Sequence, residues 1–313
     1  MNDYFLSIDK TKFENFGSLS WSDDLENYTT IIKFSSQRPF NVGRQFILNN
    51  GTNQLYRGII TDVNYDRELI YNYIAYDYGF YLSKNEVTIE FSNIEIERAI
   101  KNLLFSVKIP SGIIEEVRGT VDDKFKKKTV KHVLENLLSL ASKQTGIKYV
   151  VDCSLGAINI RPVYKINDVK GELAENFYIN SAENLGNVKI TNSIQELKNK
   201  VLIYKGDDKN SNVVYWKDEP DSISKYGILQ EIVEVDNNVN NYSILAQNTL
   251  LDRNRVKTTI EADFLGDDRI KKGVIISIRD TVVNVVGDYL VKTSEHTIEN
   301  GKHTVHCLLE LYQ

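Results

Sequence analysis

The sequence predicts a mainly β protein with an α+β insert, in which two antiparallel β modules flank a small helical domain. Its 313 residues include 18 tyrosines and 12 phenylalanines but only four prolines, a composition that suits half-buried strands. Two similar runs, Gly43–Asp77 and Gly273–Leu311, each read as three strands that end in a long one. They are either a true duplication or two ordinary antiparallel meanders, and the pattern leaves both interpretations open.

The first β domain is expected over residues 1–91. The segment Tyr28–Phe34 is predicted to be a strand, and Gln54–Ala75 is predicted to be two strands that reverse around Asp66–Glu68. Short strands separated by polar turns favour a small barrel or sandwich.

An α+β insert is expected over residues 92–184. The spacing of Ser92 and Glu95 matches a capping box and predicts a helix near 94–106. Apolar residues at three- and four-residue steps predict a second helix near 128–143, which Gly146 would end. Three lysines at 126–128 precede it and are interpreted as a solvated face rather than a partner site. A hairpin over 147–160 closes the insert.

The second β domain is expected over residues 185–313. It contains one predicted helix near 242–255 and a strand at Thr258–Phe264 with one apolar and one polar face. Asn300-Gly301 predicts a tight hairpin turn, because both central residues of such a turn favour positive φ. Three further strands are predicted at Val201–Tyr204, Val213–Trp216 and Ile228–Val235, with a polar turn at Gly206–Asn210 between the first two.

Charge and segment composition limit the partners. A net charge of -5 argues against a specific nucleic-acid binder, since neutralising phosphates requires a basic surface. No apolar run approaches the ~18 residues of a membrane span. The N-terminus lacks a basic segment followed by an apolar stretch, so we expect synthesis in a bacterial cytoplasm without a signal peptide. Cys153 and Cys307 are expected to be free, buried thiols rather than a disulfide.

No catalytic or cofactor site is expected. The sequence has no Walker loop, dinucleotide glycine pattern, nucleophile elbow or CxxC pair. Adjacent carboxylates on an extended chain point to opposite faces, whereas glycoside hydrolysis needs two that converge across a cleft. We therefore interpret the acidic pairs as solvated turns: Glu115-Glu116, Asp122-Asp123, Asp207-Asp208 and Asp267-Asp268.

A zinc site is conceivable in the last hairpin. A two-residue loop at Asn300-Gly301 would place His296, His303 and Cys307 on one face and His306 on the other. Val305 lies among the three, and diagonal neighbours are about 7 Å apart. We therefore expect no metal, and interpret these residues as the lining of a sheet face.

The chain resembles the XkdQ-like tail proteins of PBSX-type defective prophages. The resemblance covers most of the chain and consists of short structural signatures rather than a catalytic fingerprint. In the first half they are Trp21, Val42-Gly43, Tyr56–Ile60, Ala75–Asp77, Tyr81–Asn85 and Lys143–Gly146. In the second half they are Ser222–Gly227, Ala246, Leu250, Leu251, Lys272–Val274, Tyr289–Val291 and Glu295–Thr297.

This resemblance implies a structural baseplate hub of a contractile phage tail or a phage-derived bacteriocin (tailocin). Such hubs form homotrimers whose two tube-like antiparallel β-barrel modules alternate around the axis. The pseudo-sixfold ring adapts a hexameric tail tube to a trimeric spike, so the implied partners are further copies, the tube protein, the spike protein and other baseplate proteins. The resemblance implies no cofactor, and we expect no enzymatic activity.

Two alternatives from other classes are kept. A cell-wall-degrading tail-associated hydrolase would need a catalytic domain, which this sequence does not show. A carbohydrate-binding tail protein would need an exposed aromatic platform. Six residues are candidates for such a platform: Tyr71, Tyr73, Tyr76, Tyr78, Phe80 and Tyr81.

For the hub, we expect two edge strands to make the intersubunit contacts. Pairing an exposed edge with a neighbouring copy would close the ring and satisfy unpaired amides. The candidate residues are Tyr28, Thr30, Ile32, Phe34, Thr304, His306 and Leu308.

Overall fold

The computed structural model describes residues 3–165, 178–180, 185–205, 212–235, 241–280 and 284–312. Within them the protein is mainly β with few helices, as predicted. The predicted turn at Gly206–Asn210, with its acidic pair Asp207-Asp208, lies outside the described residues.

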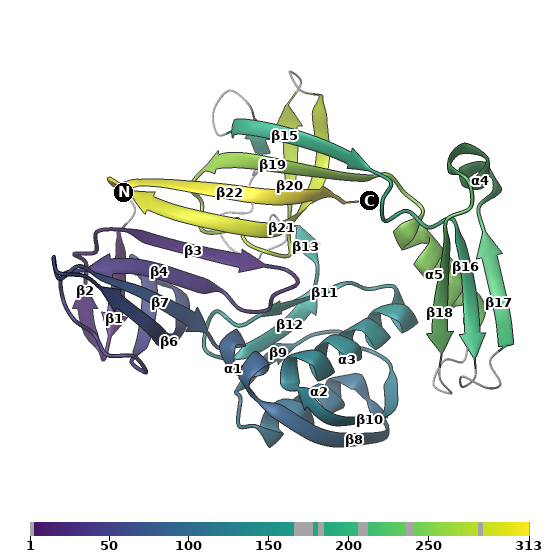
Figure 1. Cartoon of the computed structure of the whole chain (residues 1–313), viewed down its shortest axis with the longest axis horizontal. Coiled ribbons are helices and arrows are strands. Elements are labelled where there is room, and N and C mark those ends of the chain that lie inside the picture. Colours follow the sequence, from purple (N-terminus) through teal and green to yellow (C-terminus); the bar gives the residue numbers. More distant parts are fainter. Residues whose placement is uncertain are drawn as a thin grey trace.

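One large sheet joins the two ends of the chain (Figure 1). Strand β3 (Leu19–Asp24) pairs antiparallel with β21 (Val285–Glu299), with Trp21 opposite His296. On the side of β3 the path continues through β4 (Ile31–Ser36), β7 (Tyr71–Asp77), β6 (Asn53–Tyr65), β5 (Gln45–Asn50), β1 (Tyr4–Ile8) and β2 (Thr11–Phe13). On the side of β21 it continues through β22 (Lys302–Leu311), β19 (Lys257–Leu265) and β15 (Leu185–Ser193).

The pairing of the described strands does not close either β region into a barrel. Instead the pairing of β3 with β21 joins the two regions into one sheet. This sheet is open, and its described strands run in order from β15 to β2. The two similar runs of the sequence form two antiparallel meanders, β5–β6–β7 and β20–β21–β22, where β20 is Val274–Asp280. Two short strands, β13 (Tyr164–Lys165) and β14 (Tyr178–Asn180), pair parallel with β20.

The helices of the middle region cover a compact core. Helix α2 (Ile96–Ser106) and helix α3 (Val130–Thr145) bury their apolar faces against each other and against β8 (Glu86–Glu95) and β10 (Thr120–Thr129). The predicted capping box at Ser92 is wrong, because Ser92 lies within β8, at an irregularity in its pairing with β10, and α2 begins only after Glu95. Gly146 does end α3, in a left-handed conformation with φ 77.

The rest of this region is a small sheet beside the helices. The predicted hairpin is present as β11 (Tyr149–Asp152) and β12 (Ile158–Pro162), and β9 (Ser111–Ile114) adds a parallel strand to β12. A six-residue helix, α1 (Gly79–Lys84), leads from β7 into this region. Lys126–Lys128 are exposed on β10, which agrees with a solvated face.

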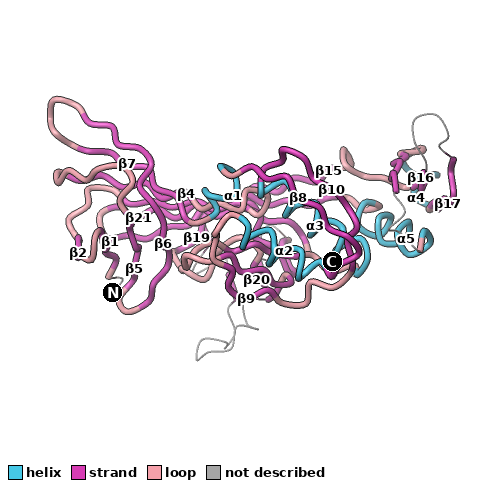
Figure 2. The backbone as a smooth tube through the Cα atoms, turned by 90° about the horizontal axis from the view of Figure 1, so that it is seen from below, coloured by secondary structure: helices cyan, strands magenta, loops and turns pink. Residues whose placement is uncertain are grey.

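A separate outer lobe projects at one end of the molecule (Figures 1 and 2). We define it as the described residues between 197 and 253. It contains the sheet β17 (Asn212–Asp218), β16 (Lys200–Lys205) and β18 (Gln230–Val235), the short helix α4 (Pro220–Tyr226), and α5 (Tyr242–Arg253) on one face of the sheet. The lobe has its own core, distinct from that of the helical region. The three domain boundaries proposed above stay a prediction.

The last hairpin has the predicted turn and register. Asn300 and Gly301 have φ of 51 and 75, as the tight turn requires. Ile298 lies opposite His303 and His296 opposite Val305, so both histidines face the same side.

The close approach of β6 to β7 depends on a glycine at position 58. A Cβ added there would lie 1.8 Å from the carbonyl oxygen of Tyr76, so Gly58→Ala cannot keep the pairing of these strands. We expect a loss of more than about 4 kcal/mol in the free energy of unfolding. Gly51→Ala has open space and a φ of 57, so only the left-handed conformation is penalised, by about 1 kcal/mol. Urea denaturation of both variants tests this, and equal stabilities would contradict the steric argument.

Candidate functional site

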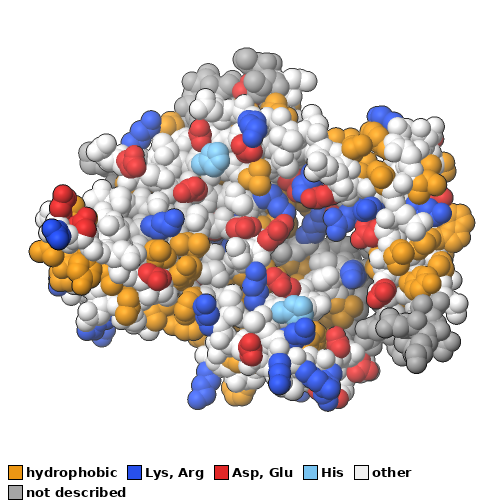
Figure 3. All heavy atoms as spheres, in the orientation of Figure 1, with side chains coloured by type: hydrophobic (Ala, Val, Ile, Leu, Met, Phe, Trp, Pro, Cys, Tyr) orange, Lys and Arg blue, Asp and Glu red, His pale blue; other side chains and the backbone are white. Residues whose placement is uncertain are grey.

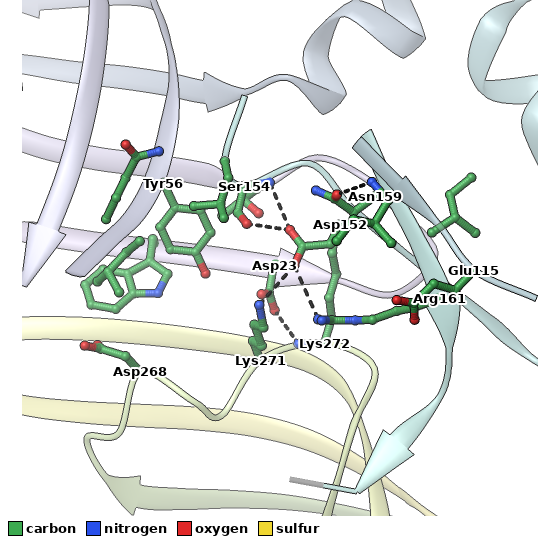
Figure 4. A pocket seen from close by; sticks show the side chains of 17 residues that line it. Asp23, Tyr56, Glu115, Asp152, Ser154, Asn159, Arg161, Asp268, Lys271 and Lys272 are labelled. Carbon is green, nitrogen blue, oxygen red and sulfur yellow. Dashed lines mark hydrogen bonds and ion pairs between the residues drawn. The ribbon is translucent and has the colours of Figure 1, made fainter. Parts of the chain in front are cut away.

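A cavity of about 340 Å³ lies where three parts of the chain meet (Figure 4). The N-terminal strands contribute Trp21, Asp23 and Tyr56, and the hairpin β11–β12 contributes Asp152 and Arg161. Lys271 and Lys272 come from the loop that precedes β20. Of the residues expected at intersubunit contacts Thr30 alone lines this cavity, together with Glu115 and Asp268 from the acidic pairs, and the lining residues lie too far apart in the sequence to form a motif.

Asp152 is the centre of a charged network in the cavity wall. Its carboxylate lies 3.0 Å from Lys271 Nζ and 3.4 Å from Arg161 Nη2, and it accepts hydrogen bonds from the amide and hydroxyl of Ser154. Burial alone would raise the pKa of Asp152, but these cations and donors together hold it below its ordinary value. The ionised carboxylate therefore ties the hairpin β11–β12 to the loop before β20.

Two further carboxylates are more deeply buried. Asp23 accepts hydrogen bonds from Ser294 Oγ at 2.7 Å and from the amide of Lys272 at 3.2 Å, and burial raises its pKa. Burial also raises the pKa of Asp77 to about 7, against the opposing charge of Lys272. Neither Asp77 Oδ2 nor the Lys272 ammonium forms a hydrogen bond within the described part of the chain. Asp77 and Lys272 therefore attract each other through their charges without a direct hydrogen bond.

Beside the cavity, a hydrogen-bonded chain connects the first strand to the last hairpin. Trp21 stacks on His296 with ring centroids 4.6 Å apart, and His296 Nδ1 lies 2.9 Å from His303 Nε2. His296 Nε2 donates to the carbonyl of Ile270 at 2.7 Å. The Tyr4 hydroxyl donates to Asp268 at 2.7 Å and lies 3.0 Å from His303 Nδ1. Burial lowers the pKa of His296 to about 3, so its ring is neutral at pH 7.

The structure groups a different set of potential metal ligands from the one that the sequence suggested. Asp268 lies with His296 and His303, their donor atoms within 4.8 Å of one another, and Cys307 is not part of this group. Each nitrogen of the two histidines already lies within 3.0 Å of another polar atom, and Asp268 is bound by Tyr4 and by Asn50 at 2.7 Å. The cluster therefore acts as a polar joint between distant strands. His306 is exposed on the opposite face, as the register predicted.

The acidic pairs divide into two kinds. Glu115, Glu116, Asp122 and Asp123 are exposed, in agreement with solvated carboxylates. Asp267 and Asp268 instead have structural partners. Asp267 forms an ion pair with Arg269 at 2.6 Å, and Asp268 accepts a hydrogen bond from the Tyr4 hydroxyl beside His303. Reading that last pair as a solvated turn was wrong.

The six aromatic residues do not form one exposed platform. Tyr73 is 1% exposed, and its hydroxyl accepts from the amide of Phe40 and donates to the carbonyl of Arg38. Tyr78 and Tyr81 pack against the core of the helical region. This arrangement removes the observation that favoured a carbohydrate-binding protein.

The two strands expected at sheet edges are interior. Strand β4, which contains Ile32 and Phe34, pairs with β3 and β7. Strand β22, which contains Thr304, His306 and Leu308, pairs with β19 and β21. Tyr28 and Thr30 precede β4, and Thr30 is buried. The expectation that these strands present unpaired amides was wrong, because each strand is hydrogen-bonded on both sides within the sheet that joins the two ends of the chain.

Both cysteines are buried and free, as predicted. Burial raises the pKa of each thiol well above its ordinary value, so neither is a reactive thiolate. Within the described residues, no helix is both long enough and apolar enough to cross a bilayer.

The fold is that of a known class of tail proteins. A tail protein from Neisseria meningitidis MC58 superimposes with a TM-score of 0.72 over 99% of this chain and 96% of its own, at 11% identity. In sequence, the chain is 25% identical over 257 residues to the uncharacterized protein YqbQ of Bacillus subtilis (strain 168). It is 23% identical over 257 residues to the phage-like element PBSX protein XkdQ of the same organism. Both alignments cover 80% of this chain and 76% of the relative.

The YqbQ-like family model matches residues 19–310. The chain belongs to the YqbQ-like family.

The buried Asp77 predicts a stability that depends on pH. Its folded-state pKa of about 7 lies above the ordinary 3.8, so between these values the folded state holds a proton that the unfolded state has lost. Stability from this group is therefore present below about pH 4 and is lost as the pH rises towards 7.

The variant Asp77→Asn keeps an acceptor for the amide of Gly79 but has no charge to bury. We expect a flatter pH profile and a gain at pH 8 of up to about 4 kcal/mol, since one pKa unit is about 1.4 kcal/mol. Urea denaturation between pH 4 and pH 8 measures both quantities. The exposed Asp62→Asn is the control, and a wild-type slope in Asp77→Asn would contradict the assignment.

Proposed function

We propose that this chain is a structural baseplate hub of a contractile phage tail or phage-derived bacteriocin. The observation that carries the proposal is the superposition on a tail protein over nearly the whole of both chains, together with membership of a family that includes the PBSX protein XkdQ. We propose a structural rather than an enzymatic role. Two observations support it: the residues of Glu115-Glu116 and Asp122-Asp123 are exposed, and the buried His296 and His303 are engaged in hydrogen bonds.

The hub would be a homotrimer with pseudo-sixfold symmetry. Each chain contains two antiparallel meanders, and three chains would supply six. A ring of this kind could meet a hexameric tail tube on one side and a trimeric spike on the other. Its partners would be further copies of the chain, the tube protein, the spike protein and other baseplate proteins, assembled into the tail of the particle.

The free edges of the large sheet replace the interior strands as candidates for intersubunit pairing. The path of paired strands ends at β15 on one side and at the three-residue β2 on the other. Among the described strands β15 pairs with β19 alone, and most of its residues are exposed. A contact between different edges of successive copies is heterologous, and such a contact closes into a ring when the rotation allows it. We propose β15 as one intersubunit edge.

The hub function predicts a trimer of the purified chain. Light scattering over a wide concentration range, with the chain alone and co-expressed with its trimeric spike, measures the molar mass. We expect three times the chain mass of 35.9 kDa in at least one condition, and imaging of that species should show a ring with six similar features. A strict monomer in both conditions would contradict the hub.

A pair of proline substitutions in β15 tests its role. Neighbouring amides along a strand point to opposite sides, so of Ile190→Pro and Thr191→Pro one removes an amide facing β19 and the other an outward amide. The variant that loses the amide facing β19 is expected to have a lower melting temperature. The variant that loses the outward amide should keep the melting temperature within a few degrees and abolish the trimer. A full trimer in both variants would exclude β15 as an intersubunit edge.

A further inference from the structure

The outer lobe is attached to the large sheet by two neighbouring chain crossings. The chain leaves at the end of β15 and returns at the start of β19, and Ser193 and Lys257 at these points are paired with each other. On the sheet side, Arg255 is anchored by Glu310 at 2.8 Å and by the carbonyl of Leu311 at 3.2 Å. On the lobe side, the amide of Lys198 donates to the carbonyl of Arg253. The backbone between these anchors, at 194–196 and at Asn254, is therefore the natural pivot.

The second contact of the lobe, between α5 and the end of α3, is narrow and polar. Lys148 Nζ lies 2.6 Å from Asp252 Oδ1, and both side chains are about half exposed. The buried residues of α5 belong to the lobe core, whereas those of α3 belong to the core of the helical region. Ile244 and Leu251 on α5 are 50% and 67% exposed, so they do not seal this contact. No shared apolar cluster joins the two helices among the described residues.

Hollows flank this contact on both sides. A cavity of about 410 Å³ is lined by residues on the side of Pro162 and Tyr312, and one of about 420 Å³ by residues on the side of Ser139 and Glu231. Both share Gly146, Lys148, Asn248 and Asp252. Both hollows are open to solvent, which leaves the contact between α5 and α3 narrow. Figure 3 shows cations and anions side by side where the lobe meets the body.

We propose that the outer lobe is a hinged arm that pivots at residues 194–196 and Asn254, and that the Lys148–Asp252 ion pair clasps it against the end of α3. An exposed ion pair is a weak restraint that salt screens. The arm therefore opens when the pair is broken or screened, while its own core and the large sheet stay intact. Opening separates α5 from α3 and merges the two flanking hollows into one cleft.

Distances between two spin labels on the full-length chain test the hinge. The labels are placed on exposed positions, with Asn136→Cys on α3 and Ser224→Cys on α4. We expect one narrow distance distribution in the otherwise unchanged protein at low salt. Lys148→Glu, or a rise in salt from about 0.02 to about 1 M, should broaden the distribution and shift it to longer distances. The charge swap Lys148→Glu/Asp252→Lys should restore the narrow distribution at low salt.

A matched variant separates this effect from a general loss of charge. Lys101 lies 2.6 Å from Glu97 on α2 and is as exposed as Lys148, but no residue of α2 lines the hollows beside the lobe contact. Lys101→Glu should leave the distribution unchanged. An unchanged distribution in Lys148→Glu would overturn the proposal, as would a failure of the charge swap to restore it or an equal broadening in Lys101→Glu. Circular dichroism confirms that each variant retains its fold.

Discussion

The antiparallel pairing of β3 with β21 is the contact on which the rest of the structure depends. It brings Leu19 opposite Ile298 and Thr293 opposite Asp24, and so turns two β regions at the ends of the chain into one sheet. The hydrogen-bonded group of Tyr4, His296, His303 and Asp268 lies beside this pairing, because Trp21 of β3 stacks on His296 of β21 and Tyr4 contacts His303 and Asp268. The cavity forms beside it, where the loop before β20 brings Lys271 to Asp152. Loss of the pairing between β3 and β21 would therefore also disrupt the cavity and the hydrogen-bonded histidines.

Local patterns predicted the local structure. The apolar period of 130–141 and the stop at Gly146 correspond to α3, and Asn300-Gly301 gave the hairpin register down to the pair of Ile298 and His303. The capping-box prediction at Ser92 failed because strand pairing with β10 outweighed a helical preference. A short motif has no means of registering a partner strand that lies some 30 residues away.

The long-range features were outside the reach of sequence patterns. Nothing near Asp23 indicates that its partners are Ser294 and the amide of Lys272, and nothing near Tyr4 indicates Asp268. The same limitation explains the error over edges: β4 and β22 were expected to be edge strands, yet each pairs on both sides once the two ends of the chain meet. Whether a strand is an edge is a property of the whole sheet and not of its own residues.

The pairing of β3 with β21 can form only late in synthesis, because the two strands lie near opposite ends of the chain. Asp24 leaves the ribosome long before its partner Thr293, and at ordinary elongation rates this delay is on the order of tens of seconds. Throughout that time β3 has an unpaired edge, the feature through which nascent chains aggregate. Its sequence Leu-Ser-Trp-Ser-Asp-Asp places two carboxylates at the end of that edge. Charges at an exposed strand edge oppose pairing with another chain, and Asp23 and Asp24 give the unfinished β3 two such charges, one of which is costly to bury in the finished protein.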